Sequence, residues 1–171
     1  MKNYFLIIFA LLLFSSFSSW SEDNDKEKIK INLMLDNWHK AAAESQFGTY
    51  FDLMTDDAIF IGTDAEENWN KTQFQAYAKP SFDNGKAWSF KVIERHIYFD
   101  KSGNMAWFDE LLDTQMKICR GSGVLVKIGK DWKIKHYVLS MTVPNDNAAE
   151  VIKIKTPIET IIIDKLSNKE Q

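Results

Sequence analysis

Four long segments rich in β-branched and aromatic residues follow one another in the second half of the chain, and they constrain the fold more than any other feature. Short turn signals ("DKSGN", "QMK" and "GKD") separate them, and they cover residues 88–100, 105–115, 118–128 and 132–143. Connections this short join neighbouring antiparallel strands. The chain therefore predicts a four-stranded antiparallel meander.

A helical pattern precedes these strands. Between residues 29 and 46, four apolar side chains recur at spacings of four, three and four: Ile31, Leu35, Trp38 and Ala42. This spacing places them on one face of an amphipathic helix.

Three more elements are expected between this helix and the meander. A short helix covers residues 47–54, and a short strand covers residues 57–62. Asn70 can cap a third helix, which Pro80 terminates because the residue before a proline disfavours helical conformation. Helices that come before an antiparallel sheet predict an α+β fold.

The first 21 residues have the order of a secretory signal peptide. A lysine at position 2 precedes an uninterrupted apolar run over residues 4–14, and small serines follow. The run is short for a membrane span, so an uncleaved anchor is the less favoured alternative. We expect a secreted or periplasmic protein, with a mature domain over residues 22–150 and a tail of unassigned structure over residues 151–171.

The mature chain is slightly acidic. Removing 21 of the 171 residues leaves 150, which suits one domain. Losing Lys2 reduces the 21 Lys and Arg to 20, against 24 Asp and Glu, so nothing favours nucleic acid.

Cys119 is the single cysteine, which excludes an intrachain disulfide. No metal or cofactor motif is present, and we expect no cofactor and no membrane contact after cleavage.

The lengths of the turns set the register of the strands. A turn centred on Met116 places Glu110 opposite Ser122, and the "DKSGN" turn places Glu94 opposite Glu110. In this register, even-numbered residues share a mostly apolar face that also holds several polar groups. The candidate pocket residues of this face are Phe108, Glu110, Arg120, Ser122, His136 and Ser140. Apolar walls around a few polar groups are typical of a small-molecule pocket.

Three of these residues could take part in chemistry. His136 is a candidate for proton transfer, since histidine titrates near neutral pH, and a core histidine with bonded nitrogens is the alternative. Arg120 could bind a ligand oxygen, or it could form an internal salt bridge with Glu110. Glu110 could act as a general base with a raised pKa if Arg120 points elsewhere. Paired with Arg120 it would stay ionised and structural, which is the favoured interpretation.

Three aromatic residues outside the centre of the sheet are candidates for the cavity mouth. Trp69, Tyr77 and Trp88 could stack on a flat ligand. The alternative is that they belong to the hydrophobic core.

The odd-numbered face of the meander is also strongly apolar. The helices can cover only one face of the sheet, so this second face would be left in water. We therefore expect a homodimer through Ile93, Ile97, Trp107, Leu111, Tyr137 and Leu139.

The Gly-Ser-Gly sequence at residues 121–123 is not a phosphate-binding loop, because no Lys-Ser or Lys-Thr pair follows it. We expect it within a central strand. There, Gly121 and Gly123 leave room for the side chains of Leu139 and Tyr137.

The order of elements resembles the SnoaL-like branch of the nuclear transport factor 2-like superfamily. Four stretches are similar: "GTDAEENW" (62–69), "AYAKPSFDNGKAW" (76–88), "RGSGVL" (120–125) and "GKDWKIKHYVLSMTVPND" (129–146). The last is the most specific, because Trp-Lys-Ile-x-His followed by Ser four residues on recurs in this branch. The resemblance covers roughly residues 28–150. It implies a cone, in which a strongly curved antiparallel sheet wraps around the N-terminal helices and leaves a cavity.

The resemblance leaves the function open, because the superfamily includes isomerases, dehydratases and cyclases as well as catalytically silent domains. The first hypothesis is an exported homodimer that binds a small, partly apolar molecule in the cavity. The second is a lyase or isomerase, with His136 or Glu110 as the base and Arg120 or Tyr77 stabilising the developing negative charge. The third is a silent dimerisation or assembly domain.

Overall fold

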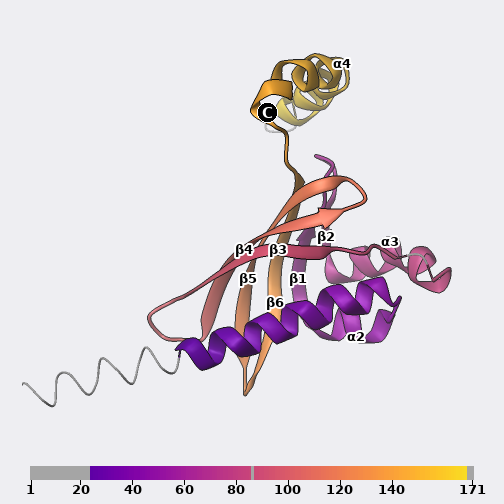
Figure 1. Ribbon diagram of the computed structural model, residues 1–171. Helices are drawn as coiled ribbons and strands as arrows, with labels where there is room; N and C mark the ends of the chain where they lie inside the picture. The colour runs from indigo at the N-terminus through magenta and orange to yellow at the C-terminus, as the bar shows by residue number, and fades with distance from the viewer. Residues whose placement is uncertain (1–23, 86, 169–171) are drawn as a thin grey trace, which may run out of the picture. The chain divides into compact units, whose positions relative to one another are not determined.

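The computed structural model describes residues 24–85 and 87–168, which form two compact units that divide between Ser140 and Met141. The first unit holds the N-terminal helices and the sheet, and the second holds a C-terminal helix (Figure 1). The predicted signal peptide lies outside the described residues.

One six-stranded sheet forms the first unit, with the strand order β2-β1-β6-β5-β4-β3. Four consecutive strands form the predicted meander: β3 (Lys91–Phe99), β4 (Met105–Thr114), β5 (Lys117–Ile128) and β6 (Asp131–Met141). β1 (Met54–Ile61) runs parallel to β6, and the short β2 (Asn68–Asn70) pairs with β1 at the edge. The predicted α+β fold with a curved sheet is confirmed.

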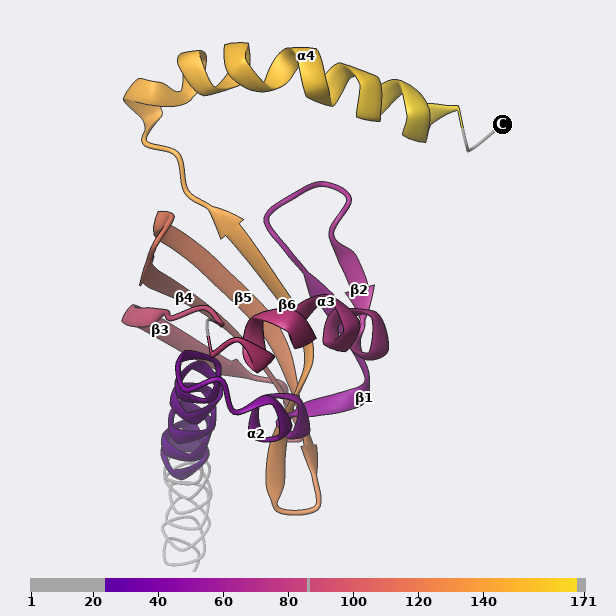
Figure 2. The same ribbon diagram turned by 90° about the vertical axis from the view of Figure 1, so that its right-hand side faces the viewer.

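Three helices pack on the same face of this sheet, as Figures 1 and 2 show. They are the N-terminal helix over residues 24–43, α2 (Phe47–Asp52) and α3 (Lys71–Asp83). The predicted apolar stripe of the first helix is confirmed, because all four of its members are buried in one core with the sheet: Ile31, Leu35, Trp38 and Ala42.

Helix α3 begins where the sequence predicts and ends later. Asn70 and Gln73 form a reciprocal capping box, in which each side chain accepts a hydrogen bond of 3.0 Å from the other's backbone N–H. Pro80 lies inside the helix, which continues to Asp83, so the predicted end at Pro80 is wrong. The buried ring of Phe82 anchors this last turn in the core and offsets the hydrogen bond that the proline cannot make.

The predicted register of β4 with β5 is wrong by one residue. Thr114 pairs with Lys117 across a two-residue turn, and Lys117 takes a left-handed conformation with φ of 68°. Glu110 therefore lies opposite Gly121 instead of Ser122. Because side chains alternate between faces, a shift of one residue turns over the whole of β5.

The predicted register of β3 with β4 is also wrong by one residue. Phe99 pairs with Ala106, and Arg95 rather than Glu94 lies opposite Glu110. The register shifts again between Val92 and Glu94. The side chains of β3 before this irregularity therefore point to the predicted face.

These shifts divide the predicted pocket face. Phe108 and Glu110 do point into the core, where they are 2% and 1% exposed. On β5 the buried residues are instead the odd-numbered ones: Cys119, Gly121, Gly123 and Leu125. On β6 they are Trp132, Ile134, Tyr137 and Leu139, so the alternation is interrupted between Ile134 and Tyr137. The prediction that four polar residues point into the cone is therefore wrong, since this pattern puts them on the outer side: Arg120, Ser122, His136 and Ser140.

The same shifts place half of the residues of the predicted dimer surface on the outside of the sheet and the other half in the core. Ile93 and Trp107 are exposed, and Leu111 is half-buried. Three other members of that predicted surface lie in the core instead: Ile97, Tyr137 and Leu139.

The second unit holds η1 (Asn145–Asn147) and α4 (Ala148–Ser167). The predicted start of the tail, at residue 151, falls within α4. This helix is 20 residues long, contains Pro157 and has no buried residue. It exposes the side chains of Ile152, Ile154, Ile158, Ile161, Ile163 and Leu166. Among the described residues, no helix combines the length and the apolar character that crossing a membrane requires.

Candidate functional site

An open pocket of about 170 Å³ lies at one end of the sheet, between strands and helix α3. Apart from Gly62, the described residues that line it are mainly large aromatic and apolar side chains, with three polar ones. The aromatic and apolar ones are Phe60, Trp69, Phe74, Tyr77, Trp88, Phe90, Met116 and Leu139, and the polar ones are Thr63, Glu67 and Gln115. This mixture is typical of a small-molecule site.

The rings of the pocket form a nearly parallel array. Trp69 stacks on Tyr77 with ring centroids 4.3 Å apart, and it lies 5.8 Å from Phe74 at an interplanar angle of 7°. Phe74 in turn stacks on Phe60 at 3.9 Å and faces Trp88 at 5.7 Å. Such an array offers flat apolar walls to a flat ligand.

Local structure fixes these rings. The capping box at Asn70 sets the start of α3 directly after Trp69. Because residues three and four apart share a helix face, Phe74 and Tyr77 project from α3 on the side of Trp69. Phe60 and Trp69 pair directly across β1 and β2, which brings the strand rings to the helix rings.

Glu67 supplies the carboxylate of the pocket. Its Oε2 accepts a hydrogen bond of 3.1 Å from the backbone N–H of Asp64, and its backbone oxygen accepts one from Gly62. A Cβ at Gly62 would collide with this carboxylate, so the glycine allows Glu67 to fold over it. Within the described part of the chain, Oε1 accepts no hydrogen bond.

The aromatic residues singled out from the sequence lie at this pocket. Trp69, Tyr77 and Trp88 all line it, and Tyr77 is 56% exposed. Phe108 lies deeper, 6.0 Å from the ring of Tyr137, and does not line it. The other three candidates lie on strand faces that point away from the core: Arg120, Ser122 and Ser140.

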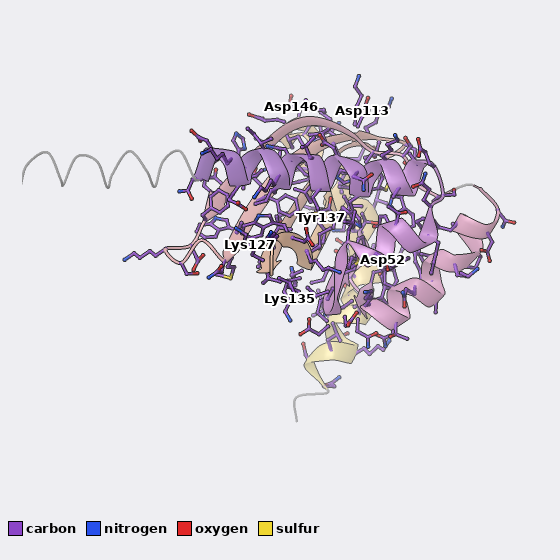
Figure 3. All side chains as sticks on the ribbon, turned by 90° about the horizontal axis from the view of Figure 1, so that it is seen from below. Asp52, Asp113, Lys127, Lys135, Tyr137 and Asp146 are labelled. Carbon is purple, nitrogen blue, oxygen red and sulfur yellow. The ribbon has the colours of Figure 1, made fainter. Side chains whose placement is uncertain are left out.

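A second group of polar side chains is closed inside the core. The carboxylate of Glu110 lies between His39 of the first helix and Tyr137 of β6, whose Nε2 and hydroxyl reach Oε1 at 2.8 Å and 3.0 Å. Arg95 donates from Nε to Oε2 at 2.8 Å. Figure 3 shows Tyr137 in the interior between the N-terminal helix and the strands, whereas Asp113 and Lys135 lie at the periphery.

Arg95 connects this cluster to the first helix. Its Nη1 donates to Asn32 Oδ1 at 3.1 Å and to Asp36 Oδ1 at 2.9 Å. Only 4% of the arginine side chain is exposed. Arg95 takes the place that the sequence had suggested for Arg120, as the charged partner of Glu110.

The electrostatics of the cluster keep Glu110 ionised. Burial acts to raise the pKa of this carboxyl group, but the hydrogen bond and charge of His39 and the charge of Arg95 outweigh it, so the pKa lies below its usual value. The alternative of a general base with a raised pKa is therefore wrong, and Glu110 is ionised as in the favoured salt-bridge interpretation, with Arg95 in place of Arg120. Burial, followed by the nearby charge of Glu110, raises the pKa of Tyr137 well above its usual value, so its hydroxyl stays protonated. His39 must then donate from Nε2, because the ionised carboxylate has no proton to give.

Gly121 makes this arrangement possible. A Cβ at this position would collide with the hydroxyl of Tyr137 and would lie 3.0 Å from Cγ of Glu110. The prediction that the glycines of β5 leave room for side chains of β6 is thus correct for Tyr137, although Gly121 rather than Gly123 provides the space.

The two candidate catalytic residues do not line the pocket. Glu110 is enclosed by its three partners, and His136 is half-buried beside Tyr137, on the opposite side of β6. In the described residues, no group of three or more His, Cys, Asp and Glu side chains could hold a metal ion.

Sequence reasoning missed His39, which is 5% exposed. The signal was present, because His39 follows Leu35 by four residues and precedes Ala42 by three, which places it on the buried stripe. Arg95 was also missed, because only the shifted register of β3 brings it opposite Glu110. Glu67 carried no signal, since it lies in a polar loop.

A curved sheet that carries helices and an open aromatic pocket on one face defines a small α+β domain. A family model described as the SnoaL-like domain matches residues 31–144, and the chain belongs to this family. Among curated proteins, none matches the sequence.

Solved structures of the nuclear transport factor 2-like (NTF2-like) class share the fold. An NTF2-like protein of unknown function from Pseudomonas putida is 13% identical, with a TM-score of 0.60 over 72% of this chain and 92% of that one. A candidate dehydratase of the NTF2-like family from Streptomyces avermitilis is 12% identical, with a TM-score of 0.61 over 71% and 99%. A protein with a cystatin-like fold from Nostoc punctiforme is 10% identical, with a TM-score of 0.55 over 67% and 90%. At these identities the likeness shows the fold alone.

Proposed function

We propose that this SnoaL-like domain binds a small, flat and largely apolar molecule in the aromatic pocket. The observation that supports this most directly is the parallel array of Trp69, Phe74, Tyr77 and Trp88 around an open cavity of about 170 Å³. An open cavity with ring faces and a few polar groups is what a ligand site requires.

Binding has more support than catalysis. The lyase or isomerase hypothesis names His136 or Glu110 as the base that reaches the substrate, and neither residue is among those that line the pocket. Glu110 is also held ionised by partners that occupy both of its oxygens. A silent assembly domain, the third hypothesis, would have no need of an open aromatic cavity.

The test compares two tryptophans. Trp69 lines the pocket, whereas Trp107 is 45% exposed on β4 and does not line it. We expect Trp69→Ala to weaken the binding of small aromatic compounds by about tenfold in calorimetric titrations, because each lost ring contact is worth about 1 kcal/mol. Trp107→Ala should leave the affinity unchanged. Equal losses in both variants, or no binding to the wild-type protein, would refute the proposal.

Export is part of the same proposal. It is supported by the order of charged, apolar and small residues over positions 1–21. Expression of the full chain in a bacterial host, followed by fractionation and intact mass measurement, should give a periplasmic product that has lost about 20 residues. A full-length product in the membrane fraction would favour an uncleaved anchor.

Homodimerisation through the outer face of the sheet also remains a proposal, now with a corrected surface. Trp107 stacks on Tyr98 with centroids 5.9 Å apart and lies opposite Val124, and Met105 lies opposite Val126. Together they make a contiguous apolar patch across β3, β4 and β5, of a kind that monomers rarely leave in water. Trp107→Lys should convert a dimer to a monomer in sedimentation experiments, and Tyr77→Lys, at the pocket, should not. A wild-type monomer would exclude this part.

A further inference from the structure

The described residues that line the pocket are asymmetric in charge. Glu67 is an acid, and none of the other lining side chains is a lysine, arginine or histidine. Thr63 and Gln115 add neutral polar groups at the same site. An anionic ligand would therefore meet one negative charge and no fixed positive one.

The aromatic rings of the pocket favour a cation, as the carboxylate does. The face of an aromatic ring carries the negative part of its quadrupole, so a cation near Trp or Tyr is attracted. Trp69 and Tyr77 stack on each other at 4.3 Å, and both line the cavity that Glu67 lines. A positively charged group in this cavity would gain from the ring faces and from the carboxylate together.

One carboxylate oxygen of Glu67 is held in place, and the other has no hydrogen-bond donor in the part of the chain that the structure describes. Its Oε2 is held by the Asp64 N–H, which fixes the side chain, while Oε1 accepts no hydrogen bond within the described residues. Glu110 offers a comparison, because its Oε1 accepts two hydrogen bonds and its Oε2 accepts one from Arg95. Of these two carboxylates, Glu67 is the one that a ligand can reach.

We infer that the ligand of this pocket is a cation, namely a compact organic ammonium compound with an aromatic or methylated head group. This inference rests on the proposed function, because it names the ligand class for the same pocket. The rings would enclose the apolar surface of the head group, and the Glu67 carboxylate would lie beside its positive charge.

The experiment uses three probes that share a phenyl ring and a tetrahedral head group but differ in charge. They are phenyltrimethylammonium, tert-butylbenzene and benzenesulfonate, each titrated below its solubility limit into the full mature chain at low and at physiological salt. We expect phenyltrimethylammonium to bind about five- to tenfold more tightly than tert-butylbenzene, from cation–π and carboxylate attraction together. Benzenesulfonate should bind most weakly.

Glu67→Gln is the decisive variant, because glutamine keeps an oxygen that can accept from the Asp64 N–H. It should remove most of the preference for phenyltrimethylammonium while leaving tert-butylbenzene unaffected. Asp113→Asn removes one charge from the exposed end of β4, outside the lining, and should change neither probe. Thermal melting of each variant checks that the fold is intact.

The outcomes separate the two proposals. Equal affinity of the wild-type protein for phenyltrimethylammonium and tert-butylbenzene would overturn the cation inference and leave the proposed pocket in place. A cation preference that survives in Glu67→Gln would also overturn it as argued, because the carboxylate would not be its source. Failure of all three probes to bind would refute the proposed function itself.

Discussion

Two glutamates of the same domain occupy opposite kinds of site. Glu110 lies in the core, 1% exposed, and three side chains donate to its two oxygens. Glu67 lies at an open aromatic pocket, where one backbone N–H holds one oxygen. A buried charge is tolerated only when it is fully paired, whereas a carboxylate beside a pocket can keep an oxygen for a ligand.

The number of hydrogen bonds that each carboxylate accepts separates a structural group from one that is open to solvent at a pocket. A cluster of His, Glu, Arg and Tyr resembles catalytic machinery when it is read as a list of residue types. The hydrogen bonds around Glu110 indicate a structural role, since His39, Tyr137 and Arg95 occupy both of its oxygens. Glu67 instead lines the open pocket, and its Oε1 accepts no hydrogen bond within the described residues.

The largest expected effect comes from opening the closed cluster. Glu110→Ala would leave Arg95 buried with its main partner gone, and we expect it to lower the free energy of unfolding by about 3–5 kcal/mol in urea denaturation. Glu94→Ala, at an exposed position of β3, is the control and should change stability by less than about 0.5 kcal/mol. A loss below about 1 kcal/mol in Glu110→Ala would mean that the cluster does not hold the first helix to the sheet.

A second test adds an atom to the same cluster instead of removing a side chain from it. Gly121→Ala would push a Cβ into the Tyr137 hydroxyl, and we expect a loss of about 1–3 kcal/mol. Removing that hydroxyl in the Gly121→Ala/Tyr137→Phe double variant should cost less than the sum of the single changes. Strict additivity would contradict the steric explanation. Gly48→Ala is the matched control, because no atom lies within 4 Å of its added Cβ in α2, so it should be neutral or slightly stabilising.

The fold could be predicted from the sequence further than the site could. The spacing of Ile31, Leu35, Trp38 and Ala42 and the lengths of the β-rich segments express local periodicities, which survive folding unchanged. The inward or outward direction of Arg120 depended instead on whether the turn at Met116 holds two residues or three. That turn lacks the Asn-Gly or Asp-Gly signature that would have fixed its length, and a shift of one residue reverses a whole strand.

The contents of the pocket also depended on contacts that no local pattern encodes. Trp69, Tyr77 and Trp88 could be singled out as large aromatics, but their common cavity forms only when α3 packs beside β1 and β2. Glu67 reaches that cavity because Gly62 lets the loop between β1 and β2 fold back tightly. Register and loop closure, which are both long-range properties, decided the site.

The dependence of stability on pH tests the ion pairs of Glu27, with an effect smaller than that of opening the core cluster. The side chain of Glu27 accepts hydrogen bonds from Lys30 and from Trp132 Nε1, and it pairs with Lys127. Burial acts to raise its pKa, but these partners outweigh burial and lower the pKa from 4.5 to about 2. The pKa of Glu110 is also lowered. As the pH falls below about 4.5, the unfolded chain binds these protons first, so stability should fall progressively toward pH 2.

The variant Glu27→Gln identifies the contribution of one group. Thermal melts between pH 6 and pH 2 should show a shallower acid decline in this variant than in the wild-type protein. Glu94→Gln, at an exposed carboxylate, should keep the wild-type slope. An unchanged slope in Glu27→Gln would show that its contacts with the β5–β6 hairpin do not favour the ionised form.

Glu67→Gln should change stability least of all these variants. Glu67→Gln and Glu110→Gln make the same chemical change at the two carboxylates. Glutamine at position 67 keeps an acceptor for the Asp64 N–H and buries no new charge, so we expect the free energy of unfolding to change by less than about 0.5 kcal/mol. Glutamine at position 110 removes the buried charge beside Arg95 and leaves only Asp36 as its charged partner among the described residues, so we expect a loss of about 1.5–3 kcal/mol. A loss above about 1 kcal/mol in Glu67→Gln would instead make Glu67 a structural residue of the β1–β2 loop, and its role toward a ligand would lose its basis.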